Sequence, residues 1–169
     1  TKLDTVLRDE RPGWLLIQGD TTTAAASALA GYYARLRIAH IEAGLRTDNK
    51  WHPFPEEMNR RIVTLLADLH FAPTETAREN LIAEGVSSEQ IRVTGNPVID
   101  ALKQMLQRPV PVDFSQMVDG VPPILVTAHR RENFGQPLRN ICEALLTLAN
   151  RFRGRVKIIF PVHRNPPVV

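Results

Sequence analysis

Residues 14–36 read WLLIQGDTTTAAASALAGYYARL, and this segment indicates the fold class. Its first four residues form a continuous apolar run, which is typical of a strand buried on both faces of a sheet. Gly19 and Asp20 interrupt the run, the threonines at 21–23 offer helix-capping hydroxyls, and residues 24–36 favour a helix. The predicted order is therefore strand, tight loop, helix.

The same order recurs along the rest of the chain. Repeated alternation of strands and helices predicts an α/β fold in which helices cover a parallel sheet. A proline-rich stretch at 108–123 lacks clear periodicity, and a second strand-helix-strand unit follows it. We place a domain boundary near Asn96. The expected strands are 14–17, 38–41, 69–72, 91–94, 124–128 and 156–160, and the expected helices, after a first one that ends before residue 11, are 24–36, 55–66, 74–84, 98–106 and 137–152.

The composition narrows the class of protein. Of 169 residues, 43% are hydrophobic and 23% charged, which argues against disorder. The longest apolar stretch, 24–34, is shorter than the roughly 20 residues of a membrane helix, so a spanning segment is not expected. Lys and Arg exceed Asp and Glu by 21 − 18 = 3, in short groups without interleaved aromatics, so a nucleic-acid surface is disfavoured.

Cysteine usage and the first residues indicate the compartment. Cys142 is the only cysteine, so the chain forms no disulfide within itself, and no zinc-ligand spacing is present. The helix face that Cys142 shares with apolar residues predicts a core position for its thiol. No secretory signal precedes the first helix, which is consistent with a cytoplasmic protein. The absence of an initiating Met suggests an internal piece of something longer.

Polar residues gather where the predicted strands end. Asp20, Glu42 and His129 each follow a strand within one to three residues. In open parallel sheets, ligands bind beyond the carboxyl ends of the strands. We therefore expect these three side chains to converge on one cleft.

Asp20 and Glu42 can each also be explained by a purely structural role. Asp20 sits where a helix N-cap is expected, and Asp is a favoured capping residue. Glu42, in HIEAGLR (40–46), is alternatively a solvated acid or a partner of Arg46. Against that alternative, the small Ala43 and Gly44 leave room for a ligand beside the Glu42 carboxylate.

Glu56 and Glu57 open a helix, where the helix dipole alone is enough to favour carboxylates. Adjacent helical side chains point about 100° apart, so at most one of the two acids can face a shared ligand. The other is expected to pair with Arg60 or Arg61 at the i+4 spacing.

The segment HRREN (129–133) follows the first strand of the second unit. Its arginines and histidine suit a diphosphate, the former by fork-like donation and the latter by proton transfer. A surface cluster in which Arg130 pairs with Glu132 is the alternative. His163 ends the next strand and either lines the same cleft or is a capped loop histidine.

Five segments in order, QGDTTT (18–23), HIEAGLRT (40–47), PFPEEMNR (53–60), TGN (94–96) and TAHRREN (127–133), closely resemble the non-hydrolysing UDP-N-acetylglucosamine 2-epimerases of bacteria. The resemblance covers nearly the whole chain. It implies two Rossmann-like domains in the GT-B arrangement, here 1–96 and 97–169. It also implies a cytoplasmic enzyme, commonly a homodimer, that works without cofactor or metal and supplies cell-envelope polysaccharide synthesis.

By this resemblance, Asp20, Glu42, Glu56 and His129 fall on the family's catalytic positions. Arg130 and His163, together with Glu56, fall where some bacterial members hold a second, activating UDP-N-acetylglucosamine. The family's N-terminal Gly-Thr-Arg-Pro-Glu and C-terminal Ser-Gly-Gly segments are absent, which suggests truncation at both ends.

The function implied by the resemblance is reversible epimerisation at C2 of UDP-N-acetylglucosamine to UDP-N-acetylmannosamine, with elimination and re-addition of UDP. The alternatives are the hydrolysing relative, a non-catalytic nucleotide-sugar-binding fragment and a nucleic-acid module. We expect the fragment alone to be inactive.

Overall fold

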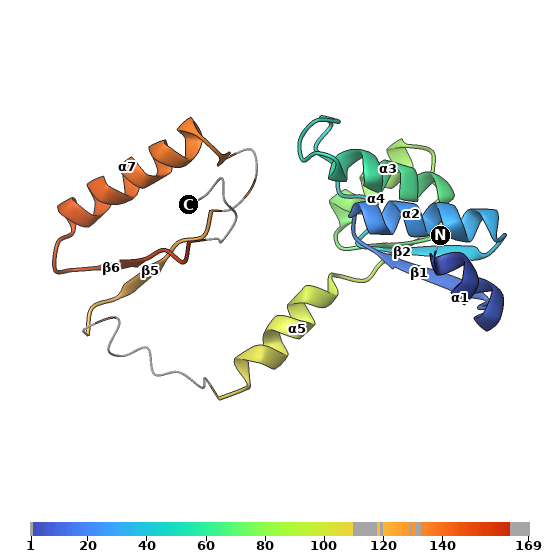
Figure 1. Cartoon of the computed structure of the whole chain (residues 1–169), viewed down its shortest axis with the longest axis horizontal. Helices are drawn as coiled ribbons and strands as arrows, with labels where there is room; N and C mark the ends of the chain where they lie inside the picture. The colour runs from blue at the N-terminus through green and yellow to red at the C-terminus, as the bar shows by residue number, and fades with distance from the viewer. Residues whose placement is uncertain (1, 110–117, 119, 129, 131–132, 163–169) are drawn as a thin grey trace. The chain divides into compact units, whose positions relative to one another are not determined.

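The chain forms two units, Thr1–Arg108 and Pro109–Val169, in the computed structural model (Figure 1). The structure describes residues 2–109, 118, 120–128, 130 and 133–162. Two predicted site residues, His129 and His163, lie outside the described residues, and so does most of the predicted linker at 108–123. The predicted domain boundary near Asn96 concerns a complete protein and stays a prediction.

The first unit is built on a parallel sheet with the strand order β1-β2-β3-β4. Neighbouring strands pair in register, with Trp14 opposite Arg37 and His40 opposite His70. The strands are β1 (Trp14–Gln18), β2 (Arg37–Ile41), β3 (Leu69–Ala72) and β4 (Ile91–Val93); the helices are α1 (Lys2–Glu10), α2 (Thr22–Tyr33), α3 (Glu56–Leu66), α4 (Glu75–Ala83) and α5 (Pro97–Leu106), with a short 3₁₀ turn at Ser88–Gln90. This alternation confirms the predicted α/β class.

Local chemistry starts two of these helices where the sequence predicts. The Thr21 hydroxyl accepts a hydrogen bond from the Ala24 amide at 3.1 Å and caps α2. The Thr74 hydroxyl caps α4 in the same way, through the Ala77 amide at 3.1 Å. Each cap satisfies a backbone donor that the first helical turn leaves unpaired.

Small residues let helices lie close to the sheet. Figure 1 shows α2 and α3 side by side next to β1 and β2, and alanines of α2 pack there with residues of the strands. The first core cluster consists of Ile17, Ala24, Ala25, Ala28, Ile38 and Val63, and the second of Ala43, Ala72, Ala77, Leu81 and Ile91.

Among its described residues, the second unit has two parallel strands and one long helix, β5 (Pro123–Leu125), α7 (Gln136–Arg151) and β6 (Lys157–Ile159). β5 ends three residues earlier than expected. None of the residues of α7 is buried, and Cys142 is exposed. The predicted core position of Cys142 is therefore wrong in this chain: its side chain is exposed, although Leu145 and Ala149 on the same predicted apolar face are half-buried and α7 packs against β6. Among the helices in the described ranges, none has the length and apolar character required to cross a membrane.

Candidate functional site

The carboxyl edge of the first sheet brings together polar groups from three strands. Gly19 and Asp20 follow β1, Glu42 follows β2, and Asn96 lies just beyond β4 as the cap of α5. All four strands run parallel, so their carboxyl ends share this edge. The candidate site is the part of that edge formed by the first unit.

Three side chains hold the turn that carries Asp20. Arg60 Nη2 donates to Asp20 Oδ2 at 2.6 Å, and Asn59 Nδ2 donates to the Asp20 carbonyl at 2.9 Å. His40 Nε2 lies 2.9 Å from the Gly19 carbonyl; because a carbonyl only accepts, Nε2 carries the proton. The capping alternative for Asp20 is wrong, since Thr21 caps α2.

Glu42 lies directly against this turn. Its Oε1 accepts a hydrogen bond from Asn96 Nδ2 at 2.8 Å, and its Oε2 lies 3.6 Å from the position that a Cβ on Gly19 would occupy. The structure therefore places the Glu42 carboxylate next to the residue that precedes Asp20. The alternative in which Glu42 pairs with Arg46 is wrong, because Arg46 binds Glu84.

Helix α3 separates the roles of its two leading acids. Glu57 is fully buried, accepts from Arg61 Nε at 3.0 Å and from the Thr47 amide at 3.2 Å, and faces Arg60 Nη1 at 3.6 Å. This confirms that one of the two acids pairs with an arginine at i+4. Glu56 is only half-buried and lies one turn before Asn59 and Arg60, the residues that hold Asp20.

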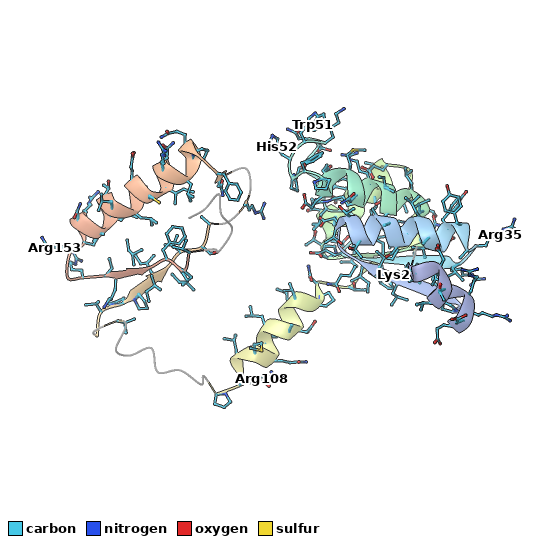
Figure 2. All side chains as sticks on the ribbon, in the orientation of Figure 1. Lys2, Arg35, Trp51, His52, Arg108 and Arg153 are labelled. Atoms are coloured by element: carbon cyan, nitrogen blue, oxygen red, sulfur yellow. The ribbon has the colours of Figure 1, made fainter. Side chains whose placement is uncertain are left out.

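A wider ion-pair network fixes the loop between β2 and α3. Arg46 binds Glu84 through Nε at 2.7 Å and Nη2 at 2.5 Å, and Arg61 bridges Glu84 and Asp48. The hydrogen bond from Arg46 holds the pKa of the Glu84 carboxyl below its usual value, against the opposing effect of burial. Figure 2 shows Trp51 and His52 on this loop, at the end away from the sheet.

Two buried histidines lie behind the site on adjacent strands. His40 and His70 are paired in register and have almost no exposed surface. Burial lowers the pKa of His40, although its hydrogen bond with the Gly19 backbone opposes the shift. Burial, together with the neighbouring His40, lowers the pKa of His70 to about 4. Both rings are therefore neutral near pH 7.

The remaining predicted site residues belong to the second unit. Arg130 is exposed, and its carbonyl accepts a hydrogen bond from the Asn133 amide at 3.0 Å. His129 and His163 fall outside the described ranges. Within those ranges, no group of three or more His, Cys, Asp or Glu residues is arranged to hold a metal ion.

Sequence comparison assigns this geometry to a family. A family model described as UDP-N-acetylglucosamine 2-epimerase matches residues 1–169. The chain belongs to this epimerase family. The Bacillus subtilis UDP-N-acetylglucosamine 2-epimerase is 44% identical over 167 residues, which are 99% of this chain and 44% of that protein. The chain thus spans less than half the length of that curated relative.

Solved structures of the epimerase family share the fold. The S. aureus MnaA-UDP structure is 43% identical with a TM-score of 0.93, and the match covers 99% of this chain and 46% of that one. The Neisseria meningitidis UDP-GlcNAc 2-epimerase bound to UDP-GlcNAc is 42% identical with a TM-score of 0.90, over 99% of this chain and 47% of that one. These matches confirm the α/β, Rossmann-like class of the GT-B-type epimerases.

Sequence reasoning did not identify the partners of the epimerase acids. Asn96 follows a strand, as Asp20 and Glu42 do, so the rule that selected them was also a signal for Asn96. Asn59 and Arg60 lie on a helix that also carries two adjacent acids and a second arginine. The sequence alone does not indicate which of these polar side chains point inward. His40 lies in a strand that otherwise consists mostly of apolar residues, and nothing in the sequence pattern distinguished it as a site residue.

Proposed function

We propose that the complete protein containing this chain interconverts UDP-N-acetylglucosamine and UDP-N-acetylmannosamine as a non-hydrolysing epimerase. The observation that carries the proposal is the arrangement of Asp20 and Glu42 at one sheet edge, each held by a hydrogen-bond donor from another element. Membership of the epimerase family and the UDP-GlcNAc bound to the Neisseria relative support the substrate class.

The proposed reaction suits carboxylates gathered around one sugar. Departure of UDP from C1 gives the ring oxocarbenium character, which makes the C2 hydrogen acidic. One acid/base group removes that proton as the C1–O bond breaks, leaving a glycal and UDP. UDP then re-adds at C1 while C2 receives a proton on the opposite face. Because inversion needs proton-transfer groups on both faces, we assign this work jointly to Asp20, Glu42 and Glu56.

The second unit supplies the groups that handle the diphosphate in this proposal. His129 and Arg130 stabilise the leaving UDP by proton donation and charge. Arg130 and His163, together with Glu56, form a second site for an activating UDP-N-acetylglucosamine. The complete protein is proposed to be a cytoplasmic homodimer that supplies cell-envelope polysaccharide synthesis and does not bind nucleic acid. The 169-residue chain alone is expected to be inactive.

Solvent isotope incorporation tests the reaction. The complete protein is incubated with UDP-N-acetylglucosamine in deuterated water, and the products are identified by NMR. We expect both nucleotide sugars to carry deuterium at C2. Free N-acetylmannosamine with UDP as the end products would instead identify the hydrolysing reaction. UDP-N-acetylmannosamine that keeps its original C2 hydrogen would exclude proton exchange with solvent.

Substitution of the acids tests their roles. Asp20→Asn, Glu42→Gln and Glu56→Gln in the complete protein should each lower turnover by ~10²-fold or more, the usual scale for loss of an acid or base. Glu89→Gln is a suitable control, because Glu89 is an exposed acid in the 3₁₀ turn before β4. Rates close to wild type in all three variants would refute the assignment, and retained binding of UDP-N-acetylglucosamine without turnover in the wild type would favour a non-catalytic binding protein.

A further inference from the structure

We propose that Arg60 is a positioning residue, which aims the Asp20 carboxylate at the sugar without itself contacting the reacting atoms. The inference rests on the proposed epimerase function. It starts from the 2.6 Å ion pair between Arg60 Nη2 and Asp20 Oδ2, which joins α3 to the turn after β1. One Asp20 oxygen is thereby fixed, and among the described residues no partner is recorded for Oδ1.

The neighbouring contacts make this grip directional. Asn59, the residue before Arg60, holds the Asp20 carbonyl at 2.9 Å, so α3 binds both the backbone and the side chain of the same residue. His40 holds the preceding carbonyl, that of Gly19. With the backbone fixed at two successive residues and one carboxylate oxygen bound, the second oxygen has little freedom in its direction.

Burial supports a role beyond surface pairing. Arg60 is 8% exposed, and its Nε has no hydrogen-bond partner among the described residues. A buried arginine with an unsatisfied donor costs stability unless its remaining contacts offset that cost. Those contacts are Asp20 and, at 3.6 Å, the fully buried Glu57. Glu57 therefore pairs with the other terminal nitrogen, Nη1, of the same guanidinium.

The adjacent arginine provides the contrast. Arg61 lies on the same helix and binds the same Glu57, but its other partners are Glu84 and Asp48, so it faces the β2–α3 loop. No contact between Arg61 and Asp20 is recorded in the described part of the chain. Replacing either Arg60 or Arg61 should weaken the ion pairs of α3 in general. Only replacement of Arg60 should also change the direction of the Asp20 carboxylate.

A double-mutant cycle in the complete protein tests the proposal. The variants are Arg60→Met, Asp20→Asn and their combination, with Arg61→Met as the matched control and C2 deuterium exchange in UDP-N-acetylglucosamine as the readout. We expect Arg60→Met to lower kcat by ~10²-fold and to change KM by less than about threefold, because a misplaced catalytic group weakens the transition state more than the ground state. Arg61→Met should lower the melting temperature while keeping kcat within about threefold of wild type.

Non-additivity separates positioning from a structural effect. If Arg60 acts through Asp20, the double variant should be about as slow as Asp20→Asn alone, not ~10²-fold slower again. Arg60→Lys, which keeps the charge without the planar fork, should recover part of the activity and replaces Arg60→Met in the cycle if that variant does not fold. Additive losses, or wild-type kcat in Arg60→Met, would overturn the inference while the proposed function stands. An inactive wild type would overturn both.

Discussion

Single buried residues set much of the chemistry of the first unit. Glu57, His40 and His70 are fully or almost fully buried polar side chains, and Glu57 is compensated by two arginines. The two histidines are compensated differently, by remaining neutral. Protonation of a buried imidazole adds a charge that the interior does not solvate, so acid should destabilise the part of the structure that holds these two histidines.

The stability of the first unit should therefore depend on pH through His70. The pKa of His70 is about 4 in the folded chain and 6.5 ordinarily, so the unfolded state binds more protons between these values. The free energy of unfolding should decrease as the pH falls from 6.5 to about 4 and, for this group, level off below that. Denaturant unfolding of the complete protein at several pH values measures it.

Two substitutions isolate the contribution of His70. His70→Asn should reduce the pH dependence between 6.5 and 4, because one of the two buried histidines with a lowered pKa is gone. His52→Asn is the control, since His52 is exposed on the loop before α3 and should leave the slope unchanged. An unaltered slope in His70→Asn would assign the acid sensitivity to other groups.

At the scale of elements, the loop after β2 depends on a close approach to α4. Gly44 has a φ of +86°, and a Cβ added there would lie 2.1 Å from the Ala77 carbonyl oxygen in α4. Asn80, one turn further along α4, donates to the Gly44 carbonyl at 2.9 Å. The obstruction is backbone, so a side chain at residue 44 would displace the loop that begins at Glu42.

Gly44→Ala should destabilise the protein more than a positive φ alone explains. The left-handed conformation costs an alanine about 1 kcal/mol, and the steric clash should add ~1–3 kcal/mol. Gly85→Ala is the matched control, because Gly85 has a φ of +92° but no atom within 4 Å of its added Cβ. Equal losses of unfolding free energy in the two variants would show that the contact with α4 carries no energy.

The whole chain is uneven in how much apolar surface it buries. The first unit has a sheet of four strands with two core clusters. In the second unit, Leu125 is 73% exposed and Leu146 is 63% exposed, and the part of the sheet that the structure describes has two strands. Two paired strands with one helix are marginal on their own.

Hydrogen exchange on the 169-residue chain should reveal this difference. Amides of β1, β2 and β3 should exchange much more slowly than those of β5 and β6, and β5 and β6 should gain protection in the complete protein.

The same preparation should show no turnover of UDP-N-acetylglucosamine, because the chain spans 44% of the length of its Bacillus subtilis relative. Comparable protection of both units, or measurable turnover by the isolated chain, would contradict this expectation.

The sequence predicted the elements better than the contacts between them. Apolar runs and capping threonines are local signals: the strand at 69–72 lies where they place it, and the helix predicted over 24–36 forms but spans Thr22–Tyr33. Asp20 and Glu42 followed from the rule that parallel strands end at one edge. The partner of Asp20 is 40 residues away and that of Glu42 is 54 residues away, and such pairings depend on how α3 and α5 are placed in space.

The prediction for Cys142 failed for a different physical reason. Periodicity correctly indicated a helix with one apolar face, but it does not indicate which residues of that face the neighbouring strand covers and which, like Cys142, it leaves exposed. His129 and His163 stay predictions, as do the roles of the site residues.

The backbone of Glu42 has a consequence for directed evolution. Its φ of +68° is a conformation that asparagine and glycine tolerate better than glutamate does. A library screened only for heat resistance should therefore enrich Glu42→Asn or Glu42→Gly, and it would discard the acid that we assign to the chemistry. Selection for heat resistance would therefore favour asparagine or glycine at position 42, whereas selection for turnover would retain glutamate.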